Sequence, residues 1–246
     1  ASGSAIIEAS ELVVEKGRLL AGHFLEANVA DIEFAAGRFT VIGTDRSIGI
    51  MEMAARLHAG TAVAPDLPQS LDVDHVLKSA PSAYPNGCHV AEVEIDPETG
   101  HVEIARYVMI NDFGTVVNPM IVEGQLHGGV VQGIGQALFE RTVYDDSGQL
   151  LTGSYMDYAL PRAADVPFFS FVSQGVRTLN NRVGAKGCGE AGCAGSLPSV
   201  MNAVVDALTP YGITHLDMPA TPQAVWRAVQ SGQIGSDRNS PRAAAS

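Results

Sequence analysis

The apolar and polar positions of this chain change their period several times, and each change indicates a new element. In residues 4–22, apolar side chains recur every three to four positions opposite glutamates, which predicts an amphipathic helix. Residues 29–41 alternate instead and predict two short strands joined at Ala36-Gly37. Residues 47–57 return to the helical period, and the glycine- and proline-rich residues 58–69 predict a connector.

The second half of the chain contains the clearest local signal, a β-hairpin. Residues 87–95 and 101–111 predict its strands, and the turn 96–100 between them has proline at its second position and glycine at its end. Further strand patterns lie at 141–144, 166–176 and 213–218, and helical patterns lie at 123–139, 197–208 and 221–229. The last of these helices begins with Thr221-Pro222, a cap followed by a proline in the first turn.

The predicted helix 123–139 is unusual because it contains five glycines. Each glycine inside a helix costs roughly 0.5–1 kcal/mol relative to alanine, so a compensating reason is expected. Close passage of a ligand and close packing of another helix explain the pattern equally well. We expect one of the two.

A second glycine-rich stretch, residues 184–195, places the single carboxylate of Glu190 among five glycines, directly before the predicted helix 197–208. Ser196 or Ser199 could cap that helix, and Pro198 suits its first turn. A loop that feeds a helix N-terminus is a good anion site. A tight structural turn with a solvated glutamate is an equal alternative.

Composition and charge exclude several classes of function. The 246 residues are 46% hydrophobic and 17% charged, enough for a sizeable core, and the net charge of -12 argues against nucleic acid and anionic membrane surfaces as partners. We expect no membrane span and, because no signal peptide is visible, a cytoplasmic protein. The three cysteines form no CxxC pair, so a zinc or iron–sulfur site is not expected; a Cys188–Cys193 disulfide stays open.

We interpret the other candidate side chains as structural. His127, on the glycine-rich helix, is expected to be packed and hydrogen-bonded, and His89 to lie at the surface of the hairpin. Trp226 is expected to anchor the last helix in the core. Asp112 and Asn118 are expected to cap backbone N–H groups in a turn-rich segment.

Five motifs in order give the chain a specific resemblance. They are VAEVEIDPETG (90–100), NDFGTVVNP (111–119), VEGQLHGGVVQGIG (122–135), GAKGCGE (184–190) and DMPATP (217–222). Residues 1 to about 228 resemble the C-terminal part of the molybdopterin-binding large subunit of the xanthine oxidase family of molybdenum hydroxylases. The upstream half of such a subunit is not present in this sequence, and Cys188 stands where a small aliphatic residue is more usual.

The resemblance implies a set of site residues. Glu190 would be the catalytic base beside molybdenum, and Gln125 would approach the metal and the pterin. The cofactor-binding residues would be Ala1, Ser2, Gly3 and Ser4 in an N-terminal cofactor loop, with Gly124, Gln125, Lys186, Gly187, Cys188 and Gly189. No protein ligand to the metal is expected, because the pterin dithiolene would hold the molybdenum.

The resemblance also implies a reaction: hydroxylation of an electron-poor carbon with water as the oxygen source. Candidate substrates are an N-heterocycle, an aldehyde or carbon monoxide, in that order. The cofactor would be molybdopterin, as the cytosine dinucleotide in a bacterial enzyme, and electrons would pass to [2Fe-2S] clusters and FAD on partner chains. A further partner would be a separate N-terminal molybdopterin-binding chain, which makes the assembly a hetero-oligomer. The alternative is a non-catalytic subunit that holds the cofactor or supports assembly.

The expected fold is α+β, of the type formed by the C-terminal part of a molybdenum hydroxylase large subunit, with two sub-domains of mixed or antiparallel sheet and packed helices. The first sub-domain would span residues 1–75 and carry the cofactor loop. The second would span residues 76–230 and carry the EGQ and GxGE motifs. Residues 231–246, polar and rich in small side chains, are expected to form a disordered tail.

Overall fold

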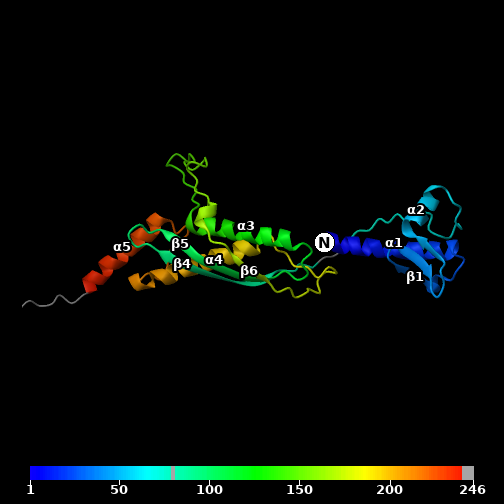
Figure 1. The fold of residues 1–246 in the computed structure, drawn as a ribbon. Coiled ribbons are helices and arrows are strands. Elements are labelled where there is room, and N and C mark those ends of the chain that lie inside the picture. The colour runs from blue at the N-terminus through cyan, green and yellow to red at the C-terminus, as the bar shows by residue number, and fades with distance from the viewer. Residues whose placement is uncertain (79–80, 240–246) are drawn as a thin grey trace, which may run out of the picture. The chain divides into compact units, whose positions relative to one another are not determined.

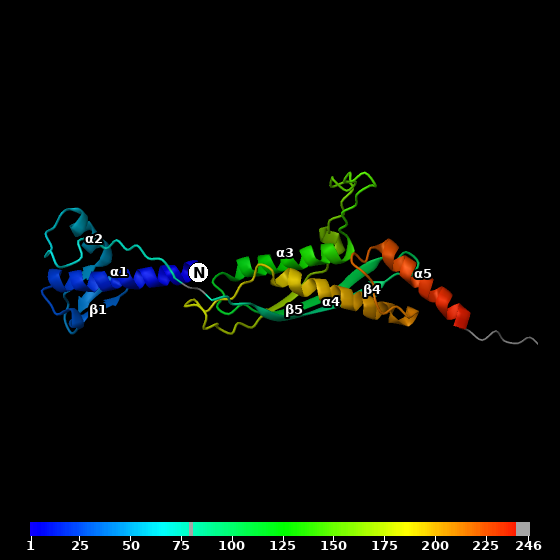
Figure 2. The same ribbon diagram turned by 180° about the vertical axis from the view of Figure 1, so that it is seen from behind.

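The structure, a computed structural model, describes residues 1–78 and 81–239. The chain forms two compact units, which we describe separately: unit 1 contains residues 1–82 and 180–183, and unit 2 contains residues 83–179 and 184–246. The predicted α+β class is confirmed, since helices accompany a three-stranded sheet in each unit (Figures 1 and 2). The sub-domain division after residue 75 stays a prediction.

Unit 1 packs helices against a small antiparallel sheet in the order β1-β2-β3. Its elements are α1 (Ser2–Phe24), a 3-10 helix (Val29–Asp31), β1 (Ile32–Ala35), β2 (Arg38–Val41), β3 (Ser47–Gly49) and α2 (Ile50–His58). Leu20 of α1, Phe39 of β2 and Met53 of α2 are fully buried in one core. Phe39 lies so close to α1 that a Cβ at Gly17 would be 2.2 Å from its ring.

The local predictions for unit 1 are confirmed except at two boundaries. Residues 29–31, predicted as the start of the first strand, form a 3-10 helix. The predicted helix 4–22 is α1, and the predicted hairpin is β1 and β2, joined at Ala36-Gly37, where both residues have positive φ. The predicted helix 47–57 was wrong in its first three residues, which form β3. They pair with β2, and this pairing buries Ile48 in the core.

Unit 2 is built on a mixed sheet in the order β4-β5-β6, in which β4 and β5 are antiparallel and β6 runs parallel to β5. Its longer elements are β4 (Asn86–Ile95), β5 (Val102–Asp112), α3 (Pro119–Leu138), β6 (Ser170–Ser173), α4 (Ala191–Leu208) and α5 (Pro222–Asn239). Short 3-10 helices lie at Ala163–Asp165 and Thr209–Tyr211. Alternate residues of β5, among them Tyr107 and Met109, are buried against the helices.

The predicted β-hairpin is confirmed as β4 and β5. Asp96 holds its turn by accepting the N–H of Glu98 at 2.9 Å, and Gly100 closes it with φ +75°. Helix α5 lies against this turn, because a Cβ at Gly100 would be 2.9 Å from Cβ of Trp226. Trp226 is nevertheless 41% exposed, so the prediction that it anchors the core was wrong. Val225 and Val229 of the same helix are buried instead.

Four other predictions for unit 2 need correction. Helix α4 begins at Ala191, not Leu197, so Pro198 lies inside the helix and neither predicted serine caps it. Residues 213–218 form no strand, and after them Ala220 N–H donates to Ala137 O near the end of α3. Residues 141–144 contribute only an isolated bridge between Tyr144 and Leu150. Helix α5 continues to Asn239, so residues 231–239 are not a disordered tail, and residues 240–246 lie outside the described residues.

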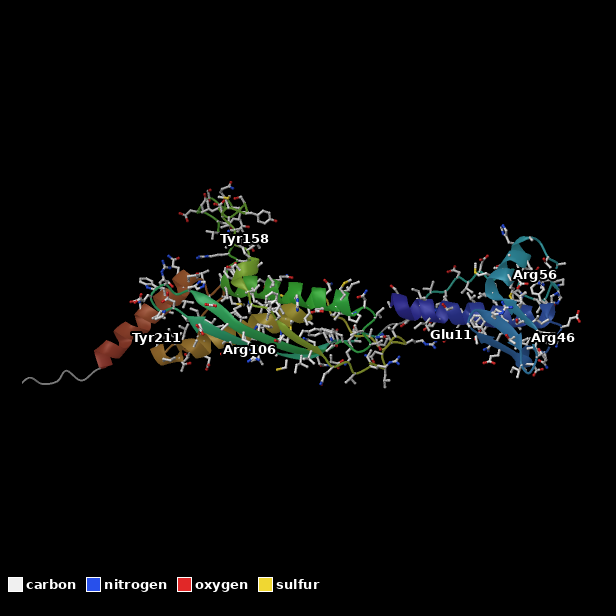
Figure 3. All side chains as sticks on the ribbon, in the orientation of Figure 1. Glu11, Arg46, Arg56, Arg106, Tyr158 and Tyr211 are labelled. Atoms are coloured by element: carbon white, nitrogen blue, oxygen red, sulfur yellow. The ribbon has the colours of Figure 1, made fainter. Side chains whose placement is uncertain are left out.

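The physical reason for the helix corrections is packing beyond the local sequence. The glycines at the start of α4 lie against other elements, and Ser231 supports α5 by donating its hydroxyl to Arg227 O at 2.8 Å. Between α3 and β6 the chain extends away from the helices, and Tyr158 of this segment donates its hydroxyl to the Glu140 carboxylate at 2.7 Å (Figure 3).

Candidate functional site

The EGQ and GxGE motifs lie at the start of two neighbouring helices, α3 and α4. A Cβ at Gly129 would be 3.1 Å from Gly192 Cα, and a Cβ at Gly133, one turn later, would be 1.8 Å from Ser196 Oγ. Contacts that advance equally along both helices show that the helices run parallel, with both N-termini at the same end (Figures 1 and 2). The glycines of α3 are thus partly explained by close helix packing, one of the two expected reasons.

This register brings Gln125 and Glu190 to the same end of unit 2. Gln125 lies one turn before Gly129, and Glu190 is the N-cap residue of α4, two residues before Gly192. Both side chains are exposed. Unit 2 by itself therefore does not enclose Glu190, and residues 191–195, which follow it, are helical and do not form a loop around it.

The surface between these motifs is open and suits an anionic group. Among the described atoms, none lies within 4 Å of a Cβ built at Gly124, Gly128 or Gly189. The first turns of α3 and α4 contain no acidic residue, and no side chain in the described part of the chain caps α4. The first turn of α4 therefore offers backbone N–H groups and the positive end of a helix dipole to an anion beside Glu190, whereas Asn118 caps α3.

The four residues before Glu190 differ in how deeply they are buried in unit 2. Gly187 and Gly189 are exposed, and Cys188 is half-buried against the core. Lys186 is nearly buried and donates its ammonium to Asp112 Oδ2 at 2.5 Å. The predicted cofactor-facing role of these residues stays a prediction, and in this structure the Lys186 ammonium faces a carboxylate.

Asp112 and Asn118 cap backbone groups, as predicted. Asp112 Oδ1 accepts the N–H of Gly114 at 2.9 Å, and Asn118 Oδ1 accepts the N–H of Ile121 at 3.2 Å at the start of α3. Asp112 does more than the sequence indicates, because Oδ1 also accepts the N–H of Val176 at 2.8 Å. The hydrogen bond from Lys186, with these two N–H donors, lowers the pKa of Asp112 to about 2.

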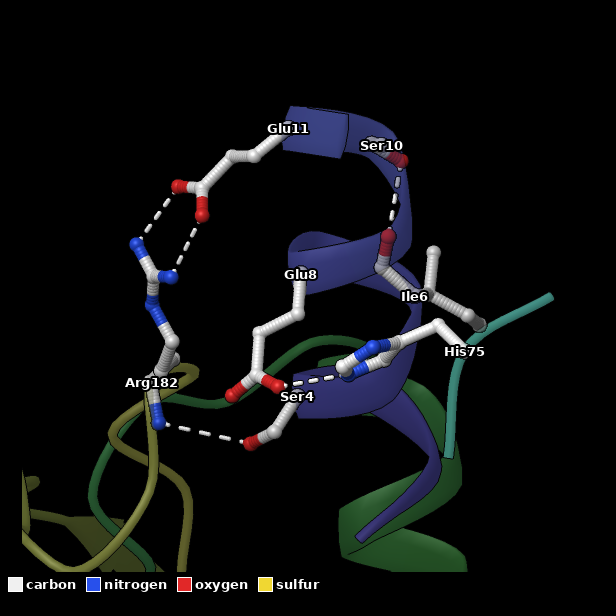
Figure 4. Close-up of polar contacts among 7 residues, drawn as sticks. All are labelled: Ser4, Ile6, Glu8, Ser10, Glu11, His75 and Arg182. Atoms are coloured by element: carbon white, nitrogen blue, oxygen red, sulfur yellow. Dashed lines mark hydrogen bonds and ion pairs between the residues drawn. The ribbon is translucent and has the colours of Figure 1, made fainter. Parts of the chain in front are cut away.

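The predicted N-terminal cofactor loop was wrong as a loop, because Ser2, Gly3 and Ser4 form the first turn of α1. No side chain among the described residues caps α1, and its first turn carries no acid. Ser4 is buried and accepts the N–H of Arg182 at 3.4 Å, so its hydroxyl helps to fix the helix start (Figure 4).

Two ion pairs follow Ser4 along α1 within unit 1 (Figure 4). The Arg182 guanidinium donates to both carboxylate oxygens of Glu11 at 2.6 Å, and His75 Nε2 lies 2.7 Å from Glu8 Oε2. These contacts hold residues 180–183 and the segment around His75 against the helix. Of the predicted site residues, Ala1 to Ser4 belong to unit 1.

His89 was predicted to lie at the surface, but its side chain is half-buried on the face of β4 that packs against α4. Its Nδ1 lies 2.7 Å from the Tyr107 hydroxyl, which is 3.1 Å from Ser199 Oγ, and its Nε2 lies 3.3 Å from Asn111 Oδ1. Burial lowers the pKa of His89 and raises that of Tyr107 to about 12. His89, Asn111 and Ser199 of this network line a cavity of about 400 Å³. Alternation along β4 places His89 on the buried face, so the sequence could have shown that it is not at the surface.

The remaining histidine and cysteine predictions are mostly confirmed. His127 is half-buried, with its ring 5.4 Å from that of Phe169, but its Nε2 has no hydrogen-bond partner among the described residues. Cys188 and Cys193 are both free thiols, so the disulfide left open is not formed. Among the described residues, no helix is long and apolar enough to cross a membrane.

Known proteins resemble this chain in sequence and in fold. The profile of the family described as "Molybdopterin cofactor-binding domain" matches residues 1–167. Subunit gamma of the 6-hydroxypseudooxynicotine dehydrogenase complex of Paenarthrobacter nicotinovorans is 38% identical over 230 residues, which are 93% of this chain and 29% of that protein.

Solved structures match this chain in fold as well as in sequence. CO dehydrogenase from Oligotropha carboxidovorans matches with a TM-score of 0.85 and 29% identity, over 95% of this chain and 29% of the other. Quinoline 2-oxidoreductase from Pseudomonas putida 86 matches with a TM-score of 0.76 and 34% identity, over 91% of this chain and 29% of the other. This chain therefore spans 29% of the length of each of these relatives.

Proposed function

Since this chain belongs to the molybdopterin cofactor-binding domain family, we propose that it forms part of the catalytic site of a molybdenum hydroxylase. The predicted resemblance and the large-subunit type of fold are confirmed by the family match and by the two structures above. The observation that carries the proposal is the parallel pairing of α3 and α4, which brings Gln125 and Glu190 to one open, glycine-rich surface.

This surface fits a bound molybdopterin. The uncapped start of α4 offers N–H groups to an anionic group, and Gly124, Gly128 and Gly189 leave room for a large ligand against the backbone. When bound, molybdopterin supplies the two-electron redox chemistry, because the metal and the pterin carry it. We infer the cytosine dinucleotide form from the resemblance, which also assigns Ala1 to Ser4 to cofactor binding.

In this function the carboxylate of Glu190 accepts a proton from the water that supplies the oxygen atom. The amide N–H of Gln125 donates a hydrogen bond to an oxygen atom in the site, and its carbonyl accepts a hydrogen bond. The side chain is neutral, so it adds no charge to the site. Glu190 is exposed in unit 2, so enclosure by cofactor, substrate and further protein has to exclude water from the site.

The rest of the site comes from protein that this sequence does not contain, since the relatives are longer by more than two thirds of their length. Large apolar side chains between α3 and β6 support a contact with further protein, because Tyr155 is 87% and Met156 is 93% exposed. A separate N-terminal molybdopterin-binding chain, partner chains with [2Fe-2S] clusters and FAD, and a cytoplasmic location stay predictions of the sequence.

We favour an N-heterocycle as the substrate class. The support comes from the relatives, whose names specify 6-hydroxypseudooxynicotine and quinoline as the compounds on which those proteins act. An aldehyde and then carbon monoxide remain the next candidates. Carbon monoxide is kept because CO dehydrogenase matches over 95% of this chain.

The direct test is the Glu190→Gln variant in the assembled complex, with Glu98→Gln in the exposed β4–β5 turn as the matched control. Metal content and turnover with nicotine, quinoline and benzaldehyde would be measured together. We expect Glu190→Gln to keep molybdenum and to lose turnover by several orders of magnitude, while the control keeps both. Near-normal turnover of Glu190→Gln would refute the role of the base.

The role of Gln125 is tested with Gln125→Ala, and Gln132→Ala, also exposed on α3, is the control. Only Gln125→Ala is expected to lower the rate or the molybdenum content. A complex that binds molybdopterin but is not reduced by any of the substrates would support the alternative of a non-catalytic subunit that holds the cofactor.

A further inference from the structure

Asp112 joins three segments that are distant in sequence. It is the last residue of β5, and its carboxylate accepts hydrogen bonds from Gly114 N, Val176 N and Lys186 Nζ. Gly114 lies between β5 and α3, Val176 lies just after β6, and Lys186 lies four residues before Glu190. Both side chains of the Asp112–Lys186 pair are nearly buried, 17% and 11% exposed.

The backbones of these segments are also paired directly. Thr115 N–H donates to Gly184 O at 2.9 Å, and Lys186 N–H donates to Phe113 O at 2.8 Å. The approach requires glycine at position 114, whose φ is +64° and where a Cβ would lie 2.2 Å from Gly184 O. A Cβ at Gly175 would likewise lie 2.2 Å from Gly114 O. The three segments therefore meet around one carboxylate.

This junction sets where the two site helices begin. From Gly114 the chain runs to Asn118, the N-cap of α3, and from Lys186 it runs to Glu190, the N-cap of α4. A shift of either segment at the junction would displace the start of its helix and, with it, Gln125 or Glu190. A site of this kind depends on positions that are held within about 0.5 Å by the residues behind it.

We propose that Asp112 and Lys186 are positioning residues, a buried ion pair that fixes the starts of α3 and α4 relative to each other for cofactor binding. Lys186 then acts on the cofactor through Asp112, and its ammonium does not contact the cofactor. This inference rests on the proposed function of the site. It differs from the role that the resemblance implies, in which Lys186 contacts the cofactor directly.

A double-mutant cycle separates the two roles of Lys186. Asp112→Asn keeps the Oδ1 acceptor and removes the charge, Lys186→Met keeps the aliphatic stem, and the third protein carries both changes. Each single variant leaves one buried charge without its partner, whereas the double variant leaves none, so the singles are expected to be worse than the double. Lys78→Met, an exposed lysine of unit 1, is the control.

Two measurements follow the cycle. In the full chain without cofactor, hydrogen exchange of residues 113–118 and 184–190 would be recorded, and in the assembled complex the molybdenum content would be determined. Each single variant is expected to exchange faster in both segments and to retain less molybdenum, on the order of tenfold for each, with partial recovery in the double variant. Lys186→Arg, which keeps the charge, is expected to restore protection.

A direct contact of Lys186 with the cofactor gives a different pattern. Lys186→Met would then lose molybdenum with unchanged exchange, Asp112→Asn would retain molybdenum, and the double variant would be as poor as Lys186→Met. That outcome would overturn the proposal, as would additive effects in the exchange cycle. A wild-type complex without molybdenum would instead refute the proposed function, while the exchange measurements in the chain would still decide whether the ion pair fixes the two segments.

Discussion

The α3–α4 contact yields the sharpest stability prediction, the substitution Gly192→Ala. A Cβ at Gly192 would lie 2.5 Å from Leu126 O and 2.7 Å from Val130 N, both backbone atoms of α3. Backbone atoms inside a helix cannot turn aside as a side chain does, so the two helices must separate. The separation loosens the contacts of the buried side chains on either side, Leu126 and Val130 among them.

The magnitude follows from two opposing terms. Inserting a methyl group into a packed site costs about 1–3 kcal/mol, and a clash with backbone belongs at the upper end. Alanine recovers up to about 1 kcal/mol relative to glycine through helix propensity. The expected net loss is about 2 kcal/mol, which lowers the melting temperature of a domain of this size by about 4–8 °C.

The assay uses Trp226, the only tryptophan of the chain, as a reporter of unit 2. Its helix shares the hydrophobic core with α3 and α4, so its fluorescence during urea unfolding follows the unit that contains the substitution. We expect a lower urea midpoint with an unchanged slope. Gly128→Ala on α3, which meets no described atom within 4 Å, is the control and should stabilise by about 0.5–1 kcal/mol.

A second comparison separates the clash from other effects of the methyl group. A Cβ at Gly133 would meet mainly Ser196 Oγ, at 1.8 Å. The single variant Gly133→Ala should therefore destabilise unit 2, and adding Ser196→Ala should restore most of the lost stability. Adding Ser196→Ala to Gly192→Ala should restore none. If Gly192→Ala stabilised the protein as Gly128→Ala does, the close packing of α3 and α4 would be refuted.

Three further predictions concern polar groups. Tyr107→Phe leaves two hydrogen-bond partners beside the cavity, where water can reach them, and should lower the unfolding free energy by about 1–2 kcal/mol in urea titrations followed by Trp226 fluorescence. Because the pKa of Asp112 is lowered from 3.8 to about 2, its ionised form stabilises the fold above pH 4, and this contribution is lost as the pH falls toward 2; thermal unfolding of wild type and Asp112→Asn should therefore converge over that range. The Arg182–Glu11 pair is about half exposed, so Arg182→Met should leave the melting temperature of unit 1 nearly unchanged in calorimetry, and any difference should shrink in high salt; a clear loss that persists in high salt would show that the pair is more than a surface ion pair.

The sequence by itself determined the elements whose signals are local. The hairpin of β4 and β5 depends on alternation and on one turn, and the start of α5 depends on Thr221, which accepts a nearby backbone N–H. The predicted start of α3 at residue 123 was wrong by four positions, since the helix begins at Pro119 after its N-cap Asn118. Such interactions join residues a few positions apart, so the residue order is sufficient to predict them. The five ordered motifs determined the family in the same way, without any knowledge of their positions in space.

Only the tertiary structure decided how the site is built. Local rules placed Pro198 in the first turn of a helix, but packing of Gly192 against α3 outweighs the cost of glycine and proline and starts α4 at Ala191. Local rules likewise left Asp112 as a turn cap, whereas its ion pair with Lys186 spans 74 positions of the chain. Helix propensities are worth about 1 kcal/mol or less per residue, or about 3 kcal/mol for proline, and the summed contacts between distant segments exceed them in the folded chain.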